Sequence, residues 1–413
     1  MQKASYLIIG GGPAGLTMAK MLMDRGVEKV TILEAADKVG GKCLSDAIDD
    51  HVVEFGTCYA IWSHRYILKQ MKKLGIKRNY LKAQRIDDRE LLDYIRAGSG
   101  PNFIWQVLKY AWLRHRLIAR ADKGDPRVNE ILAIPAKDWL DYHQLGKIEH
   151  MMHRVVTSIG YGYLTRVPLI HAMRWVDIDM LITGLLKFTV MPDRGWQNFW
   201  DRFAESLTVK LSDPAKRVIR DQRGVTVETE KGGIYQADYL INTIPMDRFA
   251  ALTHPTAAEQ TVADSVDWAG YTTTLMSVEA WPHSAPVNAW SDTCSSDAKD
   301  GQLLFSRYEC EGEDGRPLFS VGQSSKLYTP TELRELAEFS AEERGAVNPQ
   351  IIRQKIWSYM PTYKRESIQS GLLQMMQEMQ GEARTYHTGS TFSHEAISTI
   401  SAFNSRLISQ VIS

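Results

Sequence analysis

A run of glycines near the start of the chain carries the strongest chemical signal. Gly10, Gly12 and Gly15 have the G-x-G-x-x-G spacing, and Glu34 follows the last of them by 19 residues. The first glycine permits a sharp turn, the second lets a pyrophosphate approach the backbone, and the third lets a helix pack on a strand. An acid at this distance accepts hydrogen bonds from ribose hydroxyls. The spacing predicts a dinucleotide site comprising Gly10, Gly12, Pro13, Ala14, Gly15, Glu34 and Ala35.

The elements around these glycines have the order that such a site needs. Apolar runs at residues 6–9 and 30–33 predict strands, and the pattern of 13–25 predicts a helix that stops at Gly26. The helix start presents N–H groups and the positive end of its dipole to a phosphate. A glycine turn without a ligand is the alternative, but strand, turn, helix, strand and acid follow in order. The charge of Glu34 disfavours the 2′-phosphate of NADP.

The next residues narrow the cofactor. Gly40-Gly41-Lys42 follows Glu34, and Glu54-Phe55-Gly56 comes 12 residues after Lys42. This stretch resembles the GG-R/K loop and the following acid-x-Gly step of the flavin amine oxidase superfamily, which includes phytoene desaturases and protoporphyrinogen oxidases. The resemblance implies FAD rather than NAD. It also assigns further cofactor contacts to Gly41, Lys42, Cys43, Gly56 and Thr57.

Composition limits the classes of function. The chain has 413 residues, which suggests about two or three domain-sized masses. Its formal net charge of +0 gives no electrostatic case for a nucleic-acid partner. The four cysteines have no metal-ligand spacing, so we expect no metal site and a reduced, cytoplasmic chain. We see no signal peptide, and no stretch reaches the roughly 18 apolar residues of a membrane span.

Residues 102–120 predict a strongly amphipathic helix. One face carries apolar side chains that include Trp105 and Trp112, and the other carries Lys109, Arg114, Arg116 and Arg120. A basic helix with tryptophans can lie on a membrane surface. The alternative is a surface helix that packs its apolar face on its own domain.

Several segments of the middle of the chain are open to more than one interpretation. Residues 91–95 read as a strand, and 169–187 as one helix lining a pocket. On that helix, His171 and Asp177 are expected to be satisfied polar groups rather than a catalytic pair. The glycines of 159–163 lack a preceding strand and a third glycine, so we reject a second nucleotide turn there.

The second half of the chain is rich in strand patterns. Residues 217–235 predict a β-meander, 238–245 a buried strand, and 268–360 an antiparallel sheet interrupted by a helix at 332–344. The superfamily has the same meander, which implies that the backbone at Val218 meets the adenine. Residues 191–196 loosely resemble its P-x-G-G turn, with Arg194 in place of the first glycine.

The C-terminal stretch resembles the last motif of the superfamily, a strand followed by Gly-Asp/Glu. Gly389 is in place, but Ser390 stands where the acid is expected. A hydroxyl can still bind a phosphate, and the resemblance adds Ile397 and Ser398 to the cofactor contacts. A helix at about 398–412 closes the domain.

The expected fold class is α/β, with a Rossmann-type FAD-binding domain (GR2-like) and a second α+β substrate domain built on an antiparallel sheet. We predict that the FAD domain is discontinuous and uses residues 1–85, 190–250 and 365–413. The predicted substrate domain uses 86–189 and 251–364.

One branch of the superfamily is most similar, the FAD-containing polyenoic fatty acid isomerases. The features are GGGPAG with GGKC, I-G-Y-G at 159–162, W-S-Y-M-P at 357–361 and M-Q-G at 379–381. In that branch flavin N5 takes a hydride from a carbon between two cis alkenes and returns it to give a conjugated diene. The resemblance implies a small lipid-like substrate. The predicted pocket includes Tyr161, Trp357 and Tyr359, and the alternatives for Trp357 and Tyr359 are one wall of an amine cage or packing in the core.

Other outcomes of the same chemistry stay open. Loss of a proton instead of hydride return gives desaturation, with an oxidant such as O2, and a nitrogen-bearing substrate gives a flavin amine oxidase. A catalytically decayed flavin-binding protein is a further alternative. The sequence has one dinucleotide fingerprint, which disfavours an NAD(P)H-driven reductase. It has no triad or metal cluster, so no catalytic residue is assigned.

Overall fold

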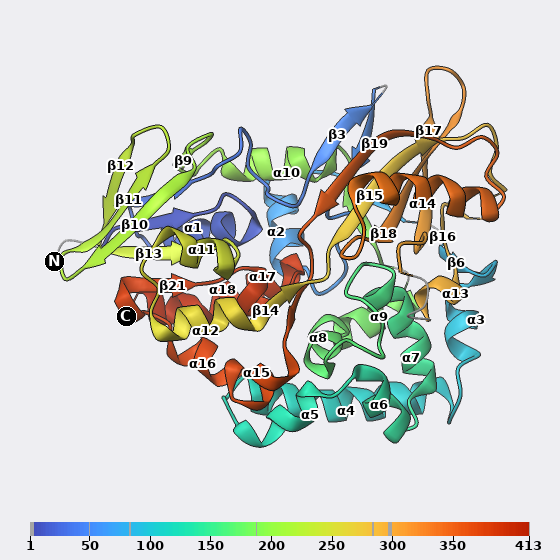
Figure 1. The fold of residues 1–413 in the computed structure, drawn as a ribbon, viewed down its shortest axis with the longest axis horizontal. Coiled ribbons are helices and arrows are strands. Elements are labelled where there is room, and N and C mark those ends of the chain that lie inside the picture. Colours follow the sequence, from blue (N-terminus) through green and yellow to red (C-terminus); the bar gives the residue numbers. More distant parts are fainter. Residues whose placement is uncertain are drawn as a thin grey trace.

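The structure is a computed structural model that describes residues 4–48, 50–81, 84–186, 188–282, 285–295 and 300–412. Two sheets and a group of helices make up the fold (Figure 1). A parallel sheet lies on the left of this view, an antiparallel sheet lies at the upper right, and helices line the lower edge. The predicted fold class is confirmed.

The parallel sheet contains the predicted βαβ unit. Its five strands occur in the order β21-β13-β1-β2-β9, and every neighbouring pair is parallel. The chain runs from β1 through helix α1 into β2, and α1 packs against the C-terminal helix α18. The bounds are β1 (Tyr6–Ile9), α1 (Pro13–Asp24), β2 (Val30–Leu33), β9 (Val209–Lys210), β13 (Tyr239–Asn242), β21 (Thr385–His387) and α18 (Ile397–Val411).

Smaller sheets flank this core. The predicted meander forms a three-stranded antiparallel sheet. There are also three two-stranded sheets: β3 and β4 form a hairpin, and the other two pair segments that are distant in sequence. The meander consists of β10 (Ala215–Asp221), β11 (Gly224–Thr229) and β12 (Ile234–Ala237). The pairs are β3 (Ser45–Ile48) with β4 (His51–Glu54), β5 (Arg78–Tyr80) with β8 (Val190–Pro192), and β14 (Val266–Trp268) with β20 (Pro361–Tyr363).

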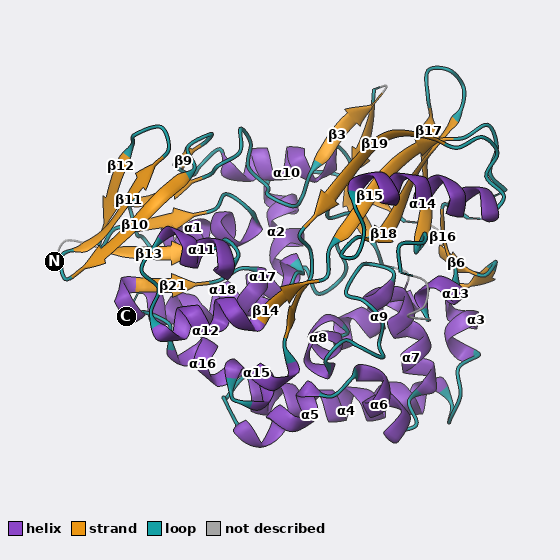
Figure 2. Cartoon of the chain, viewed as in Figure 1, coloured by secondary structure: helices purple, strands orange, loops and turns teal. Residues whose placement is uncertain are grey.

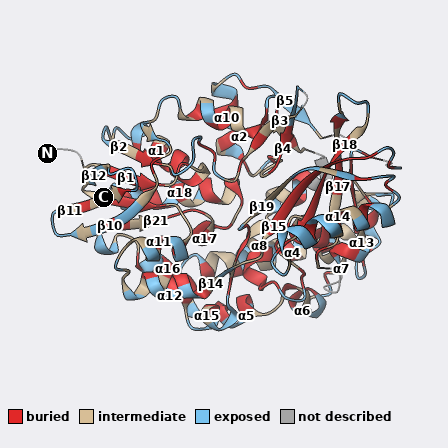
Figure 3. Ribbon diagram, turned by 45° about the horizontal axis from the view of Figure 1, so that its top comes forward, coloured by how far each residue is buried: buried red, intermediate tan, exposed pale blue. Residues whose placement is uncertain are grey.

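The large antiparallel sheet has seven strands in the order β19-β15-β18-β17-β16-β6-β7, with one parallel pair between β16 and β6. All seven residues of β15 are buried, since this strand lies inside the sheet between β19 and β18, and Figure 3 shows long buried stretches in this sheet. The bounds are β6 (Gln84–Ile86), β7 (Arg89–Glu90), β15 (Tyr271–Ser277), β16 (Val287–Ala289), α13 (Ser291–Cys294), β17 (Phe305–Glu311), β18 (Pro317–Ser324), α14 (Pro330–Glu343) and β19 (Gln350–Trp357).

A helical layer follows the lower edge of the molecule (Figure 2). The prediction of a strand at residues 91–95 is wrong, because these residues belong to a helix. The single helix predicted at 169–187 is two helices with a break at Val176 and Asp177. Lys187 lies outside the described residues. The bounds are α3 (Leu91–Arg96), α4 (Phe103–Ala121), η1 (Pro126–Val128), α5 (Asn129–Ala133), α6 (Ala136–Tyr142), α7 (Gly146–Met152), a π-helical turn η2 (His153–Thr157), α8 (Leu169–Trp175) and α9 (Ile178–Leu186).

The remaining helices lie around the parallel sheet and between it and the helical layer. The longest of them, α10, buries four aromatic side chains in the same hydrophobic cluster as residues of β1, α1 and β2. The bounds are α2 (Arg65–Lys73), α10 (Gly195–Ala204), α11 (Met246–Leu252), α12 (Ala257–Ser265), α15 (Arg365–Gln369), α16 (Leu372–Glu378), η4 (Glu382–Arg384) and α17 (Ser390–Ser393).

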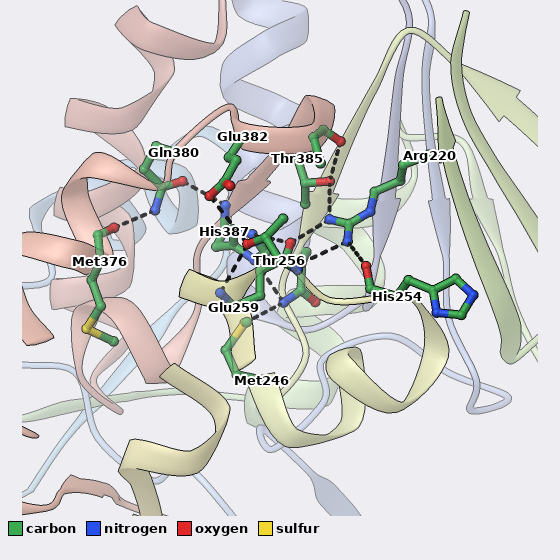
Figure 4. Close-up of polar contacts among 12 residues, drawn as sticks. Arg220, Met246, His254, Thr256, Glu259, Met376, Gln380, Glu382, Thr385 and His387 are labelled. Atoms are coloured by element: carbon green, nitrogen blue, oxygen red, sulfur yellow. Dashed lines mark hydrogen bonds and ion pairs between the residues drawn. The ribbon is translucent and has the colours of Figure 1, made fainter. Parts of the chain in front are cut away.

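A buried ion pair fastens the meander to the parallel sheet (Figure 4). Arg220 of β10 donates to both carboxylate oxygens of Glu259, the second bond being 2.8 Å, and also to Thr385 at the start of β21. Glu259 in turn closes the capping box of α12 with Thr256, and the ring of His387 lies 3.2 Å away. Burial alone would raise the pKa of Glu259, but His387 and Arg220 lower it to about 2. The carboxylate therefore stays charged.

Candidate active site

The glycine turn shows which of its glycines the protein itself requires. Gly10 has φ +108°, and a Cβ on Gly15 would lie 2.0 Å from the carbonyl oxygen of Gly10. A Cβ on Gly12, in contrast, would meet only Gly41 Cα, at 3.8 Å. Chain packing therefore explains Gly10 and Gly15, whereas the missing side chain of Gly12 leaves open space in front of the backbone. Open space at this position is what a pyrophosphate needs.

The start of α1 lies at the same place. Gly12 is its N-cap and Pro13 its first residue, and no described side chain caps the helix. Pro13 has no N–H to satisfy, so Ala14 and Gly15 supply the first free donors. Gly389, at φ +92°, brings the turn after β21 against this helix start, where its Cβ would lie 3.7 Å from that of Ala14. Ser390 follows as the first residue of α17.

Glu34 lies beside the turn at the end of β2. Its carboxylate accepts hydrogen bonds from the backbone N–H of Gly11, at 2.6 Å, and of Ala36, at 2.7 Å. A carboxylate has about four acceptor positions, so two remain for ribose hydroxyls. Ala35 is exposed next to it. The N–H of Asp213 donates to the carbonyl of Glu34, which brings the start of the meander alongside.

Val218 lies within that meander, in the middle of β10 opposite Val227. Its side chain is buried in the main hydrophobic core. Its backbone contact with adenine stays a prediction.

The Gly-Gly-Lys loop docks on the glycine turn through a bond from Gly40 N to Gly11 O. Lys42 is held by Glu395, at 3.1 Å, and by the carbonyl of Ser358, and it lies over the rings of Trp268 and Tyr359. Burial lowers the pKa of Lys42, and Glu395 opposes that effect. The loop is thus a fixed part of the site.

Segment 56–57 lies directly against this loop. A Cβ on Gly56 would come within 1.9 Å of the carbonyl oxygen of Lys42, and Thr57 N donates to the same oxygen. The thiol of Cys43 donates to the hydroxyl of Thr57 at 3.3 Å. Burial raises the pKa of Cys43 to about 12, so this sulfur is a neutral packing group. The structure therefore brings together residues that the sequence placed in one site.

A cavity of about 250 Å³ opens beside this loop. Five residues of the predicted sites line it, namely Gly56, Thr57, Tyr359, Ile397 and Ser398. Most of its other walls are apolar and come from helices α3, α7 and α9, from the π-helical turn and from the antiparallel sheet. The start of α18, which no described side chain caps, lies at the same cavity, since Ile397, Ser398 and Thr399 line it.

The three predicted pocket aromatics have different positions. Tyr359 lines the cavity and donates its hydroxyl to the carbonyl of Lys42 at 2.7 Å. Trp357 stacks on Tyr359, with centroids 5.5 Å apart, and donates its indole N–H to Phe55 O. Tyr161 stacks on His394 at 4.2 Å and accepts from Glu395 N. Trp357 and Tyr161 therefore do not line the cavity. They contact residues that do, namely Tyr359 and Glu395.

Charged side chains also line the cavity, and the sequence did not single them out for this role. The acids are Glu54, Asp177 and Glu395, and the bases are Arg154 and Arg307. Glu54 accepts from Ser45 and from Trp196 N, Asp177 accepts from Met180 N, and Glu395 pairs with Lys42. Burial raises the pKa of Glu54 to about 7 and also raises those of Asp177 and Glu395.

His171 and Asp177 are satisfied polar groups, as the sequence predicted. His171 accepts from the backbone N–H of Tyr363 at 2.9 Å, and Asp177 accepts from Met180 N at 2.6 Å as the cap of α9. They bind separate partners and form no catalytic pair.

A family model described as flavin containing amine oxidoreductase matches residues 13–344. The chain belongs to this family. FAD is therefore its cofactor, as predicted, and the family is one of flavin-containing oxidoreductases. The residues present fit the cofactor, since the open space at Gly12, the uncapped start of α1 and the remaining acceptors of Glu34 suit its diphosphate and ribose.

Within the flavin amine oxidoreductase family, the curated relatives are distant. Amine oxidase B of Bos taurus is 30% identical over 271 residues, which cover 59% of this chain and 50% of that protein. Polyamine oxidase 4 of Oryza sativa subsp. japonica is 24% identical over 254 residues, covering 59% and 51%. The chain thus spans about half the length of the curated relatives that it matches.

Solved structures resemble the fold of this family member over its whole length. The CLA-producing fatty acid isomerase from P. acnes has a TM-score of 0.86 at 20% identity, with 99% of each chain covered. A putrescine oxidase has a TM-score of 0.72 at 15% identity, again with 99% coverage. At these identities the likeness is one of fold.

Proposed function

We propose that this flavoenzyme acts on an unsaturated fatty-acyl chain, from which it removes a hydride. Bound FAD supplies a hydride acceptor and donor at flavin N5. Return of the hydride to another carbon shifts a double bond without net oxidation. Loss of a proton instead gives a desaturated chain and requires an oxidant such as O2.

The observation that carries this proposal is the character of the cavity beside the predicted cofactor residues. Its walls are mostly apolar, and each of its three carboxyl groups already has a hydrogen-bond or ion-pair partner. A cationic amine would need an available carboxylate, or a cage of facing aromatic rings, to offset its desolvation. Trp357 and Tyr359 instead stack on each other, at an interplanar angle of 13°.

The residues of the chain then have simple tasks. Apolar walls hold the alkene and exclude water, which protects a carbocation from hydrolysis. Tyr359 is one of the side chains that line this space, and the positive charge would be spread over the conjugated carbons of the substrate itself. No side chain needs to move a proton for isomerisation. A reaction without proton transfer by the chain agrees with a cavity in which each of the described carboxyl groups already has a hydrogen-bond or ion-pair partner.

Amine oxidation is the second candidate, and the family description with its amine oxidase relatives favours it. An amine oxidase would consume O2 and release peroxide. An isomerase would do neither.

The experiment incubates the purified holoprotein with linoleic acid and separately with a panel of amines. We expect new diene absorbance from linoleic acid without oxygen uptake, and no peroxide from the amines. Apoprotein stripped of FAD is the control. Peroxide from an amine, together with no diene absorbance from linoleic acid, would establish amine oxidation as the function. An absence of both signals, with the flavin remaining oxidised in anaerobic mixtures, would indicate a decayed flavin-binding protein.

We also propose a cytoplasmic enzyme that contacts an anionic membrane surface through α4. Four large apolar side chains of this helix face solvent, namely Ile104, Trp105, Leu108 and Trp112, at 49–72% exposure. The helix contains no acidic residue, and Arg116 and Lys109 lie over Trp112 and Trp105. Such a face suits the interface of an anionic bilayer. No helix in the described ranges is long and apolar enough to cross a membrane.

The inner face of α4 borders a second cavity. Its Tyr110 is fully buried and donates to Val176 O, while Arg114 and Ile118 line this second cavity of about 640 Å³. The two cavities share Ser63, His64, Asp177, Ser398 and Thr399. We propose that an acyl substrate reaches the site from the membrane by this route.

A further inference from the structure

Arg154 is a buried cation that has no counterion among the residues that the structure describes. It lines the cavity with 6% of its surface exposed, and its Nε has no hydrogen-bond partner. In the described part of the chain no carboxylate pairs with it. An unpaired buried guanidinium costs free energy, and a buried donor without a partner calls for an explanation, of which a bound ligand is one.

The second arginine of the cavity is already neutralised. Arg307 donates to Glu309 at 2.7 Å and contacts the hydroxyl of Tyr59 at 3.3 Å. The neighbours of Arg154 do not neutralise it in the same way, because burial raises the pKa of Cys294 to about 12 and that of Tyr271 well above its usual value. The thiol and the phenol therefore stay neutral beside the guanidinium.

The position of Arg154 is built into the fold. It lies in the π-helical turn η2, a geometry that is often found at functional sites. Its Nη1 donates to Ser158 Oγ at 2.7 Å, and Tyr271 of β15 donates its hydroxyl to the carbonyl of Ser158 at 3.2 Å. This fixes one edge of the guanidinium and leaves the Nε edge without a partner.

Two glycines make room for the tyrosine that supports this turn. A Cβ on Gly322 would lie 2.0 Å from the hydroxyl of Tyr271, and one on Gly160 would lie 2.4 Å from its ring. Tyr271 also lies next to Tyr359, with ring centroids 6.3 Å apart, and Tyr359 bonds Lys42 of the Gly-Gly-Lys loop. The arginine and the predicted cofactor loop are thus held in one connected framework.

Resting on the proposed acyl substrate, we propose that Arg154 binds the substrate carboxylate through its unpartnered Nε edge. A guanidinium offers two parallel N–H donors to a carboxylate, and both oxygens are satisfied in one geometry. The chain of a free fatty acid then extends through the apolar part of the cavity toward Tyr359. Esters and alcohols lack the charge and leave the guanidinium unpaired.

The test measures binding of saturated ligands, which cannot react. Holoenzyme is titrated with decanoate and with methyl decanoate, and the flavin absorbance reports occupancy. We expect the acid to bind at least about tenfold more tightly than the ester, because a hydrogen-bonded charge is lost with the ester. In Arg154→Gln the two ligands should bind within about twofold of each other. Arg127→Gln, at an exposed arginine paired with Asp125, is the control and should keep the preference.

Two further variants test the proposal if Arg154→Gln does not fold. Arg154→Lys keeps the charge and should retain part of the preference for the acid. Ser158→Ala removes the hydroxyl that orients the guanidinium and should weaken acid binding several-fold without affecting binding of the ester. The proposal is overturned if Arg154→Gln, or both other variants, keep the full preference of the wild type, or if the wild type has none. A preference that disappears in Arg154→Gln while linoleic acid yields no diene would support the carboxylate site and refute the isomerase.

Discussion

The carboxyl of Glu54 makes the stability of this protein depend on pH. It accepts hydrogen bonds from Ser45 and Trp196 N, with 1% of its surface exposed. Burial raises its pKa from the ordinary value of 4.5 to about 7. A group whose pKa is raised on folding stabilises the folded state fully below pH 4.5, and this contribution is lost as the pH rises through about 7.

The size of the effect follows from the two pKa values. Each pKa unit corresponds to about 1.4 kcal/mol, so ionised Glu54 lowers the free energy of unfolding by about 3 kcal/mol relative to the protonated group. An unfolding entropy of about 2.1 cal/mol/K per residue gives about 0.9 kcal/mol/K for 413 residues. The melting temperature should therefore fall by about 4 °C between pH 4.5 and 8 on account of this residue alone.

The assay compares the wild type with Glu54→Gln, which has no charge to bury. Tm of both proteins is measured at saturating FAD from pH 4.5 to 8. We expect the difference, variant minus wild type, to rise by about 4 °C across this range. Glu335→Gln, at an exposed position of α14, is the control and should run parallel to the wild type. Parallel curves for Glu54→Gln as well would refute the assignment of a raised pKa to Glu54.

Three other predictions follow from the geometry. Gly15→Ala should unfold or lose FAD because its Cβ meets the carbonyl oxygen of Gly10, whereas Gly12→Ala should fold normally and hold less FAD than the wild type. A wild-type FAD content in either variant would contradict the role assigned to that glycine. Arg220→Met should destabilise by about 3–5 kcal/mol, because it removes the arginine that pairs with the buried Glu259. Adding Glu259→Leu should recover part of the loss in thermal unfolding, and an unchanged Tm in the single variant would argue against this pairing. Trp105→Ser with Trp112→Ser should reduce sedimentation with anionic vesicles at unchanged Tm, and undiminished binding would exclude α4 as the contact.

The N-terminal unit could be predicted because its signals are local. A short strand, three spaced glycines, a helix and an acid specify a turn within about 30 residues, and each glycine has a physical reason. The meander and the antiparallel sheet could also be predicted, because alternating apolar residues and turn residues indicate a strand whichever strand it pairs with.

Errors arose where a short apolar run is compatible with two periods. Residues 91–95 contain Leu, Tyr and Ile, which suit a strand, yet Tyr94 and Ile95 bury against neighbouring elements as part of helix α3. The break at Asp177 had a local signal that was overlooked. An aspartate before an apolar run is a helix N-cap, and Asp177 caps α9 in this way.

The charges of the cavity could not be predicted, since they depend on tertiary contacts. Lys42 and Glu395 are 353 residues apart in the sequence and pair only in the folded chain. Whether Arg154 has a counterion likewise depends on which carboxylates of other elements reach it. Sequence patterns locate residues on elements, but the partners of a buried charge are fixed by the packing of those elements.

The residues that suit the cofactor and the residues that would select the substrate lie in different parts of the site. The residues that suit a dinucleotide lie on the glycine turn, β2 and the Gly-Gly-Lys loop, and these motifs alone do not distinguish an acyl chain from an amine. The proposed distinction lies in the charges of the cavity. A protonated amine would enter a site whose carboxyl groups have partners and whose Arg154 has no counterion among the described residues, so both desolvation and repulsion oppose it. A carboxylate on an apolar chain meets the reverse conditions, and this is the physical basis of the fatty-acid substrate that we propose.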